Sequence, residues 1–308
     1  MNNDYWFNPD AGAGRRAPRE AIPEEYRGNV PPEEPYIAGQ DLQRAVNLAI
    51  YLGRPLLLEG EPGCGKSRLA RAIAWNLQVP FFPWYVTSGT RARDGLYFFD
   101  SLRRLNDVQL QENRQKDPNE PKNYREWRAL GSAFKVAESG VRSVVLIDEI
   151  DKADTDFCND LLTVLDDQQE FTVPETNERI VAPAASKPII IITSNREKGD
   201  LPEPFLRRCL YFCLSFPTRD ELLQIVAAHA RDPRRRDEPQ VQEAVDKFLS
   251  IRQDSELKRK PGTSEFRDWL KARENFKDRP TERVSFPETL FKHREDWERY
   301  SGSTDSTR

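Results

Sequence analysis

The sequence has few of the residues that hold metal ions or form disulfide networks. Its 308 residues include only two histidines and four cysteines, and the cysteines are widely spaced. Four scattered cysteines are too few for a disulfide framework in a chain of this length, and no metal-ligand spacing of cysteine and histidine occurs. The composition therefore excludes a disulfide-stapled secreted module and a zinc module, and it favours reduced cysteines in the cytosol.

Long apolar runs and an excess of one charge are also missing. No window reaches the roughly 18 consecutive apolar residues of a membrane span, and Met1–Asp10 lacks the layout of a signal peptide. The net charge of −4 is not the strongly basic balance of a dedicated nucleic-acid binder. We therefore expect a cytoplasmic protein without a membrane span, and nucleic acid is not its expected partner.

Short apolar runs alternate with helical patterns through the first two thirds of the chain. Runs without polar alternation are typical of strands that are covered on both faces, and helical patterns lie between them. This alternation predicts an α/β fold with a parallel sheet, which binds ligands at the carboxyl ends of its strands. The three runs are Leu56–Leu58, Val144–Ile147 and Ile189–Ile192.

The composition predicts four segments. Residues 1–35 are rich in proline and predict a flexible tail, whose aromatic cluster Tyr5-Trp6-Phe7 could pack locally or dock on the body or on a partner. Residues 36–217 form the predicted α/β core. Residues 218–300 keep only helical patterns and predict a smaller helical domain, and residues 301–308 predict a frayed C-terminal tail.

Two stretches interrupt the alternation inside the predicted core. Asn106–Lys122 is polar, contains two prolines and predicts a surface loop or insertion. Phe171–Val181 has two β-favouring ends around a polar centre, which predicts a hairpin. We expect both to lie outside the parallel sheet.

The strongest motif is GEPGCGKS, Gly60–Ser67, which fits the phosphate-binding pattern G-x-x-x-x-G-K-[ST] between a strand and a helix. Gly63 and Gly65 let the backbone N–H groups turn toward phosphate oxygens at a helix N-terminus. Lys66 then reaches the β and γ phosphates, and the Ser67 hydroxyl completes a Mg²⁺ shell. The alternative is a glycine-rich turn with a surface lysine.

Polar residues end two of the predicted strands. In VVLIDEID, Asp148 suits Mg²⁺ and its waters, and Glu149 suits the polarisation of a water that attacks the γ phosphate. In IIIITSNRE, Asn195 would place its amide where it can orient that water. Alone, such acids are commonplace and such an asparagine is usually a turn residue.

Two arginines, Arg207 and Arg208, stand in LPEPFLRRC ahead of another apolar run. An arginine aimed at the nucleotide of a neighbouring subunit supplies the positive charge that phosphoryl transfer requires. On composition alone, a pair of surface arginines is the alternative interpretation.

Together these motifs resemble the AAA+ ATPases and, within them, the MoxR-like branch, over about Tyr36–Tyr300. The resemblance assigns the Walker A motif to Gly60–Ser67, the Walker B motif with its catalytic glutamate to Asp148 and Glu149, and sensor 1 to Asn195. Arg208 aligns best with the arginine finger, with Arg207 as the reserve. The resemblance implies a nucleotide-binding set of Gly60, Glu61, Pro62, Gly63, Cys64, Gly65, Lys66, Ser67, Arg68 and Ile37, with Lys260 of KPGTSEFRDWL as the sensor-2 candidate.

The resemblance also implies an architecture and partners. It implies a P-loop NTPase core with a five-stranded parallel sheet sandwiched by helices, a small all-α lid, and a ring, usually a hexamer. The cofactors would be ATP and Mg²⁺, because no [NT]KxD motif for reading guanine occurs. A client with a von Willebrand A domain is the expected partner, and the hairpin and the insertion commonly face the pore of such rings.

Three functions remain open at this stage. The leading hypothesis is an ATP-driven machine that remodels or activates a partner protein. The second is an ATP-gated assembly switch or scaffold in a signalling or defence system. The third is a nucleic-acid translocase, for which Arg91 with Arg93 and Arg234–Arg236 are the local basic clusters, although a solvated surface is the usual role of such clusters.

Overall fold

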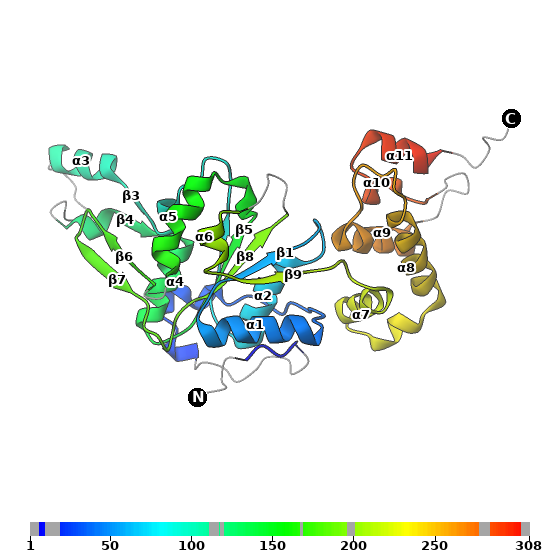
Figure 1. Ribbon diagram of the computed structural model, residues 1–308, viewed down its shortest axis with the longest axis horizontal. Helices are drawn as coiled ribbons and strands as arrows, with labels where there is room; N and C mark the ends of the chain where they lie inside the picture. The colour runs from blue at the N-terminus through cyan, green and yellow to red at the C-terminus, as the bar shows by residue number, and fades with distance from the viewer. Residues whose placement is uncertain are drawn as a thin grey trace. The chain divides into compact units, whose positions relative to one another are not determined.

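The computed structural model of the chain is shown in Figure 1 and describes residues 6–9, 19–110, 117, 120–166, 169–195, 201–276 and 284–302. The chain forms two compact units. The first comprises Met1–Glu34, Ala38–Gly60 and Lys66–Leu214, and the second comprises Pro35–Ile37, Glu61–Gly65 and Ser215–Arg308. The phosphate-loop residues Glu61–Gly65 thus cluster with the C-terminal part of the chain.

A five-stranded parallel sheet forms the centre of the first unit, which confirms the predicted fold class. Its strand order is β2-β5-β8-β1-β9. Every residue of β5 and β8 is buried, which explains why these segments lack polar alternation. The strands are β1 Leu56–Glu59, β2 Phe81–Tyr85, β5 Val144–Asp148, β8 Ile189–Ser194 and β9 Leu210–Cys213.

The β2 strand has the sequence FFPWY, and its proline breaks the pattern of a central strand. The structure places β2 at one edge of the sheet, where β5 is its only partner among the described strands. An edge strand tolerates proline because one row of its N–H groups needs no partner in the ladder.

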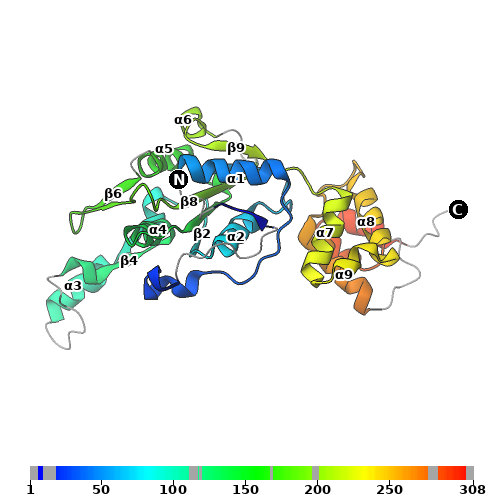
Figure 2. The ribbon, with the colours of Figure 1, turned by 90° about the horizontal axis from the view of Figure 1, so that it is seen from below.

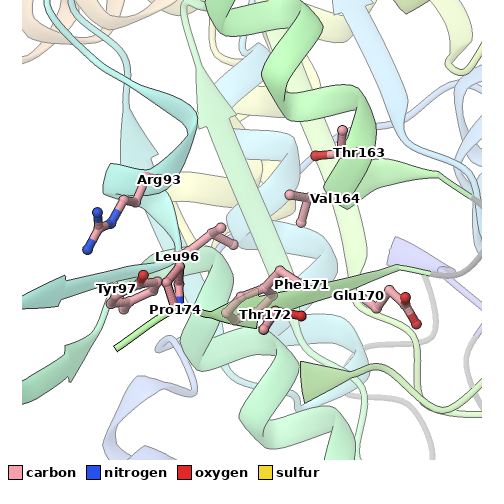
Figure 3. Close-up of a pocket in the computed structure, with 9 residues that line it drawn as sticks. All are labelled: Arg93, Leu96, Tyr97, Thr163, Val164, Glu170, Phe171, Thr172 and Pro174. Carbon is pink, nitrogen blue, oxygen red and sulfur yellow. The ribbon is translucent and has the colours of Figure 1, made fainter. Parts of the chain in front are cut away.

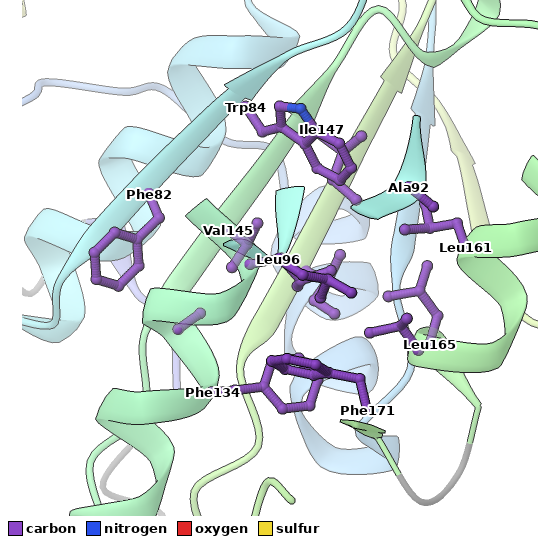
Figure 4. Packing of buried hydrophobic residues seen from close by; sticks show 14 of the residues in the cluster. Phe82, Trp84, Ala92, Leu96, Phe134, Val145, Ile147, Leu161, Leu165 and Phe171 are labelled. Atoms are coloured by element: carbon purple, nitrogen blue, oxygen red, sulfur yellow. The ribbon is translucent and has the colours of Figure 1, made fainter. Parts of the chain in front are cut away.

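One face of the sheet is covered by a large apolar cluster (Figure 4). Val145 and Ile147 of β5 meet Phe134 and Leu161 from the covering helices in this cluster. The alternate β5 residues point to the opposite face, against which α2 packs. The helices of this unit include α1 Gln40–Leu52, α2 Lys66–Leu77, α4 Ala129–Glu138, α5 Thr155–Leu165 and α6 Glu203–Leu206.

The expected hairpin is present as two antiparallel strands, β6 Glu170–Val173 and β7 Glu178–Val181. A second pair, β3 Tyr97–Phe99 and β4 Arg125–Trp127, leads into and out of α3, Ser101–Leu110. Figures 1 and 2 place α3 and both strand pairs at the same end of the first unit.

The predicted loop at Asn106–Lys122 is helical up to Leu110, and residues 111–116, 118 and 119 lie outside the described part of the chain. The helix begins after Asp100, whose carboxylate accepts a hydrogen bond from the Arg103 backbone N–H at 2.8 Å. This N-terminal cap satisfies a helix amide that would otherwise have no partner. A 3₁₀ turn, Pro121–Tyr124, follows the insertion.

The described parts of the predicted N-terminal tail pack on the first unit. Phe7 is only 1% exposed, and its backbone exchanges hydrogen bonds with the Asn47 side chain at 2.8 and 3.1 Å. The Asn76 side chain binds the backbone of Asn8 in the same way. Ile22 is also buried, so the aromatic cluster docks on the body through Phe7, whereas Tyr5 lies outside the described residues.

From Ser215 onward, every regular element in the described residues of the second unit is a helix. Its core gathers apolar side chains from successive helices, including Leu222, Phe248, Phe266 and Trp269. No helix among the described residues of the chain is long and apolar enough to cross a membrane. The helices are α7 Arg219–Ala230, α8 Pro239–Arg252, α9 Thr263–Asn275, α10 Pro287–Leu290 and α11 Arg294–Ser301.

Gly131 provides a test of the packing between α4 and the segment before β3. A Cβ atom at this position would lie 1.9 Å from the Leu96 carbonyl oxygen. Alanine favours a helix over glycine by about 1 kcal/mol, but relieving the clash costs more. We expect Gly131→Ala to lower the free energy of unfolding by about 2 kcal/mol in urea titrations. Gly89→Ala, where the added atom meets nothing within 4 Å, is the matched control and should unfold like the unmodified chain.

Candidate functional site

The phosphate loop has the backbone that the sequence predicts for it. Between the end of β1 and the start of α2, Gly63 and Gly65 have φ angles of 81° and 100°, which L side chains rarely adopt. The loop runs into the N-terminus of α2, a 12-residue helix. Lys66 is buried, and its Nζ donates a hydrogen bond to the Gly60 carbonyl oxygen at 2.7 Å. A helix N-terminus and a lysine amine therefore lie together just after the end of β1, and both favour a bound phosphate.

Ser67 and Asp148 meet across the sheet, although 81 positions separate them in the sequence. The Ser67 hydroxyl donates to Asp148 Oδ1 at 2.7 Å. Thr193, next to last in β8, donates its hydroxyl to the same oxygen at 2.7 Å. Hydroxyl and carboxylate oxygens are the hard ligands that Mg²⁺ prefers, so this pair fits the predicted metal site.

Glu149 leaves the strand in an unusual conformation. Its φ and ψ are 59° and 51°, in the left-handed region that a residue with a side chain rarely enters. Its backbone N–H donates to the Thr193 hydroxyl at 2.8 Å, and its Oε1 lies 3.4 Å from the Asn195 amide nitrogen. Strained backbone of this kind persists where the surroundings fix it, often at functional sites.

Two neighbours complete the surroundings of Glu149. Lys152 forms an ion pair with the second carboxylate oxygen of Glu149. Asp151 is buried, and its carboxylate accepts the backbone N–H of Asn195 at 3.2 Å. The structure thus brings the predicted Glu149 and Asn195 together, and it adds three residues that the motifs do not single out: Thr193, Lys152 and Asp151.

Thr193 is the most informative of these additions. Its single hydroxyl donates to Asp148 and accepts from the backbone of Glu149, so it links the two acids. The sequence position of Thr193 could have indicated this role. It stands directly before Ser194 and Asn195 at the end of a buried strand, and polar groups inside a sheet require partners.

The two arginines lie elsewhere in the same unit. The backbone N–H of Leu210 donates to the carbonyl of Pro55, which precedes β1, whereas the phosphate loop follows β1. Arg207 and Arg208 therefore lie at the amino-end edge of the sheet, opposite to Lys66. They do not join the cluster around Glu149 of the same chain.

Arg54 fixes the backbone of this arginine segment. Its guanidinium donates to the carbonyl oxygens of Arg207, Arg208 (3.1 Å) and Cys209 (3.4 Å). The guanidinium of Arg208 itself lies 3.7 Å from the Asp166 carboxylate and donates to a carbonyl of α6 at 3.1 Å. The Arg207 side chain is exposed and has no hydrogen-bond or ion-pair partner within the described part of the chain.

Cysteines near this segment are packing groups. Burial raises the pKa of the Cys209 thiol to about 12, against the opposing influence of the Arg54 guanidinium. Burial also raises the pKa of Cys158 to about 11. Both thiols are therefore neutral near pH 7 and have little nucleophilic character. Cys64 in the phosphate loop is buried as well.

The remaining predicted nucleotide contacts are spread out. Arg68 pairs with the Glu34 carboxylate, at 2.8 Å from its Nε, within the first unit. Ile37 is half-buried and belongs to the second unit, and Pro62 is exposed. Lys260 is exposed at the end of the segment before α9. A buried arginine of the second unit, Arg252, contacts the phosphate loop instead, through Glu61 at 2.6 Å.

A separate hollow of about 470 Å³ lies beside the β6–β7 hairpin (Figure 3). Its apolar lining includes Leu96 and Phe171, and none of its residues belongs to the phosphate loop or to the acidic strand end. Glu175 of the hairpin turn pairs with Arg93 and accepts the Tyr97 hydroxyl at 2.8 Å. Burial and this hydrogen bond raise the pKa of Tyr97 to about 12, so the phenol stays a donor near neutral pH.

Comparison with known families decides the identity of this unit. A model of the AAA domain, dynein-related subfamily, matches residues 55–209, half of the chain. The chain belongs to the AAA domain family. The match supports an AAA+ ATPase, a class that uses nucleotide and usually Mg²⁺ and is typically oligomeric. It spans the phosphate loop, the acidic strand end, Asn195 and both arginines of this AAA domain, and no curated protein matches the chain.

The link between Asp148 and Glu149 can be tested at Thr193. Thr193→Val keeps the shape but removes the hydroxyl, which leaves the Glu149 N–H without its acceptor. An unsatisfied group of this kind costs about 1–3 kcal/mol, so we expect ATP turnover to fall by roughly tenfold or more with little change in nucleotide affinity. Thr193→Ser keeps the hydroxyl and should retain most activity; equal turnover of the valine and serine variants would contradict the linking role.

Proposed function

We propose that the chain is a MoxR-like AAA+ ATPase that binds ATP with Mg²⁺, hydrolyses it in a ring, and thereby remodels or activates a partner protein. The observation that carries this proposal is the convergence of Ser67, Asp148, Thr193 and Glu149 in one hydrogen-bonded cluster beside Lys66. Phosphoryl transfer depends on such positioning and on charge stabilisation more than on covalent chemistry by the protein.

Each residue has a defined role in this proposal. The loop amides and Lys66 bind the phosphates, and Ser67 with Asp148 holds Mg²⁺, which supplies charge neutralisation when bound. Glu149 accepts a proton from the attacking water, and Asn195 orients that water. Lys152 pairs with one oxygen of the Glu149 carboxylate and the Asn195 amide lies beside the other, so the two neighbours hold the carboxylate in place.

The arginine segment supports action between subunits. Arg207 and Arg208 lie at the edge of the sheet opposite to the phosphate loop, and Arg54 holds their backbone in place. A guanidinium on that edge cannot serve the nucleotide of its own chain, but it can serve the nucleotide of the next subunit in a ring. Arg208 is the first candidate for this role and Arg207 the second.

The MoxR-like assignment draws on two additions to the sheet. The β6–β7 hairpin directly precedes β8, and α3 with its flanking strands forms the insertion. Leu102 and Leu105 of α3 are exposed, at 76% and 52%, and offer an apolar surface to a client. By resemblance, that client is a protein with a von Willebrand A domain, and the ring is a hexamer.

The division of labour between Lys66 and Glu149 is testable. We expect Lys66→Ala to abolish detectable ATP binding in calorimetry. Glu149→Gln should bind ATP with near-normal affinity while turnover falls by about 10²–10⁴-fold, the usual contribution of a general base. The Glu149→Gln protein should also retain its client during co-purification with ATP. Full biological function of that variant would instead favour the ATP-gated switch.

Ring-dependent catalysis makes a separate prediction. Turnover per chain should rise with protein concentration. Of the two variants Arg208→Ala and Arg207→Ala, the one that removes the finger should lower turnover by about 10³-fold. The control is Arg234→Ala, whose side chain is 90% exposed in the second unit. Turnover that neither the two finger variants nor dilution changes would contradict the ring mechanism. Stimulation of turnover by DNA in a salt-sensitive manner would instead favour a translocase.

A further inference from the structure

The C-terminal helical unit contacts the phosphate loop through a buried arginine. Arg252 is the last residue of α8 and is 8% exposed. One guanidinium nitrogen donates to Glu61 Oε2 at 2.6 Å, and another donates to the carbonyl oxygen of Pro261, just before α9. Both partners belong to the same compact unit as Arg252.

The guanidinium is also held by an aromatic ring. Its central carbon lies 3.4 Å from the centroid of Phe216, a close cation–π contact. A buried guanidinium is costly unless it is paired and hydrogen-bonded, and here one carboxylate, one carbonyl and one ring face satisfy it. The fixed donors are therefore aimed at Glu61 before any ligand arrives.

A second contact fixes the loop two residues further on. The backbone N–H and the hydroxyl of Thr263 both donate to the Gly63 carbonyl oxygen, at 3.1 and 2.8 Å. A Cβ at Gly63 would lie 2.6 Å from the Gly262 Cα, so the two glycines allow this approach. Two residues therefore hold the loop. Arg252 binds Glu61 and also the Pro261 carbonyl, and Thr263, two residues after Pro261, binds Gly63.

Glu61 poses an electrostatic problem for a phosphate-binding loop. Its carboxylate sits second in GEPGCGKS, among residues that in the proposed function bind a triphosphate. Like charges repel, and an unpaired carboxylate would weaken the binding of that ligand. The side chain of Glu61 is 52% exposed, so solvent screens this charge only in part, and the Arg252 guanidinium pairs with it.

We propose that Arg252 is a positioning residue for nucleotide binding, which acts by holding and neutralising Glu61 beside the phosphate loop. The inference rests on the proposed function, because it presupposes a nucleotide at this loop. Its consequence is that the end of α8 contributes to nucleotide affinity without a contact to the nucleotide. The effect should be visible in binding and should separate from the chemical step.

The test is a double-mutant cycle read by isothermal titration calorimetry with a non-hydrolysable ATP analogue and Mg²⁺. We expect Arg252→Met to weaken binding roughly tenfold at low salt, because the Glu61 carboxylate loses the guanidinium that neutralises its charge. Arg252→Met combined with Glu61→Gln should regain most of the lost affinity, and Arg252→Lys should retain most of it. The deficit of Arg252→Met should shrink to about threefold at 0.5 M salt through screening.

Controls separate this role from damage to the fold. Arg273→Met removes an arginine that also stacks on a ring, Trp269 at 5.1 Å, and pairs with Glu243 in the same unit, and it should leave affinity unchanged. Glu61→Gln alone keeps the loop backbone and the arginine packing and removes only the negative charge, so it should bind the analogue more tightly than the unmodified chain does, which tests the charge argument even if Arg252→Met folds poorly.

Three results would overturn the inference: normal affinity of Arg252→Met, no recovery in the double variant, or a loss of about fivefold or more in Glu61→Gln alone. A failure of the unmodified chain to bind the analogue at all is a different result, because it would refute the proposed function itself and the inference with it.

Discussion

The candidate site depends on one carboxylate oxygen. Asp148 Oδ1 accepts a hydrogen bond from Ser67 at the start of α2 and another from Thr193 near the end of β8. These two bonds join the end of the phosphate loop to two strands. Asp148 lies 81 positions after Ser67 in the sequence, and Thr193 lies 126 positions after it. Without these bonds, the acidic end of β5 and the loop after β1 would share one end of the parallel strands but would not be parts of one cluster.

The sheet topology makes this convergence possible. β5 and β1 flank β8, and all three run parallel, so their carboxyl ends meet at one edge. The left-handed backbone of Glu149 then turns the chain sharply, which keeps the second acid beside the first. Strands that are buried on both faces leave little freedom for their ends to shift, so the apolar packing of β5 and β8 also positions the polar groups at their carboxyl ends.

The sequence predicts the elements whose pattern is local and strong. Residue order is enough to recognise the apolar runs that become β1, β5 and β8, the phosphate loop, and the hairpin within Phe171–Val181. Lys66, Ser67, Asp148, Glu149 and Asn195 follow from them, because parallel strands align their ends. The contacts of Ser67 with Asp148 and of Glu149 with Asn195 are a property of the fold.

Other features depend on contacts between distant segments and leave no local pattern. Pro83 makes the β2 segment look unlike a strand in the sequence, because proline inside a strand is acceptable mainly when that strand lies at the edge of a sheet. Phe7 and Asn8 have the sequence pattern of a tail because their partners, Asn47 and Asn76, are 40 and 68 positions away in the chain. In the sequence, Arg252 resembles any arginine that ends a helix in a highly charged stretch. What distinguishes it is its contact with Glu61, 191 residues away in the chain, and this contact is visible only in the folded structure.

Arg54 has a consequence for communication through the sheet. It stands two residues before β1, and the phosphate loop begins directly after the four residues of that strand. A strand of this length spans only about 13 Å, and one end is bonded to the arginine segment while the other end carries the loop. β1 is therefore a short strand that is fixed at both ends. A displacement of the arginine segment along the axis of β1 would move the phosphate loop by nearly the same distance.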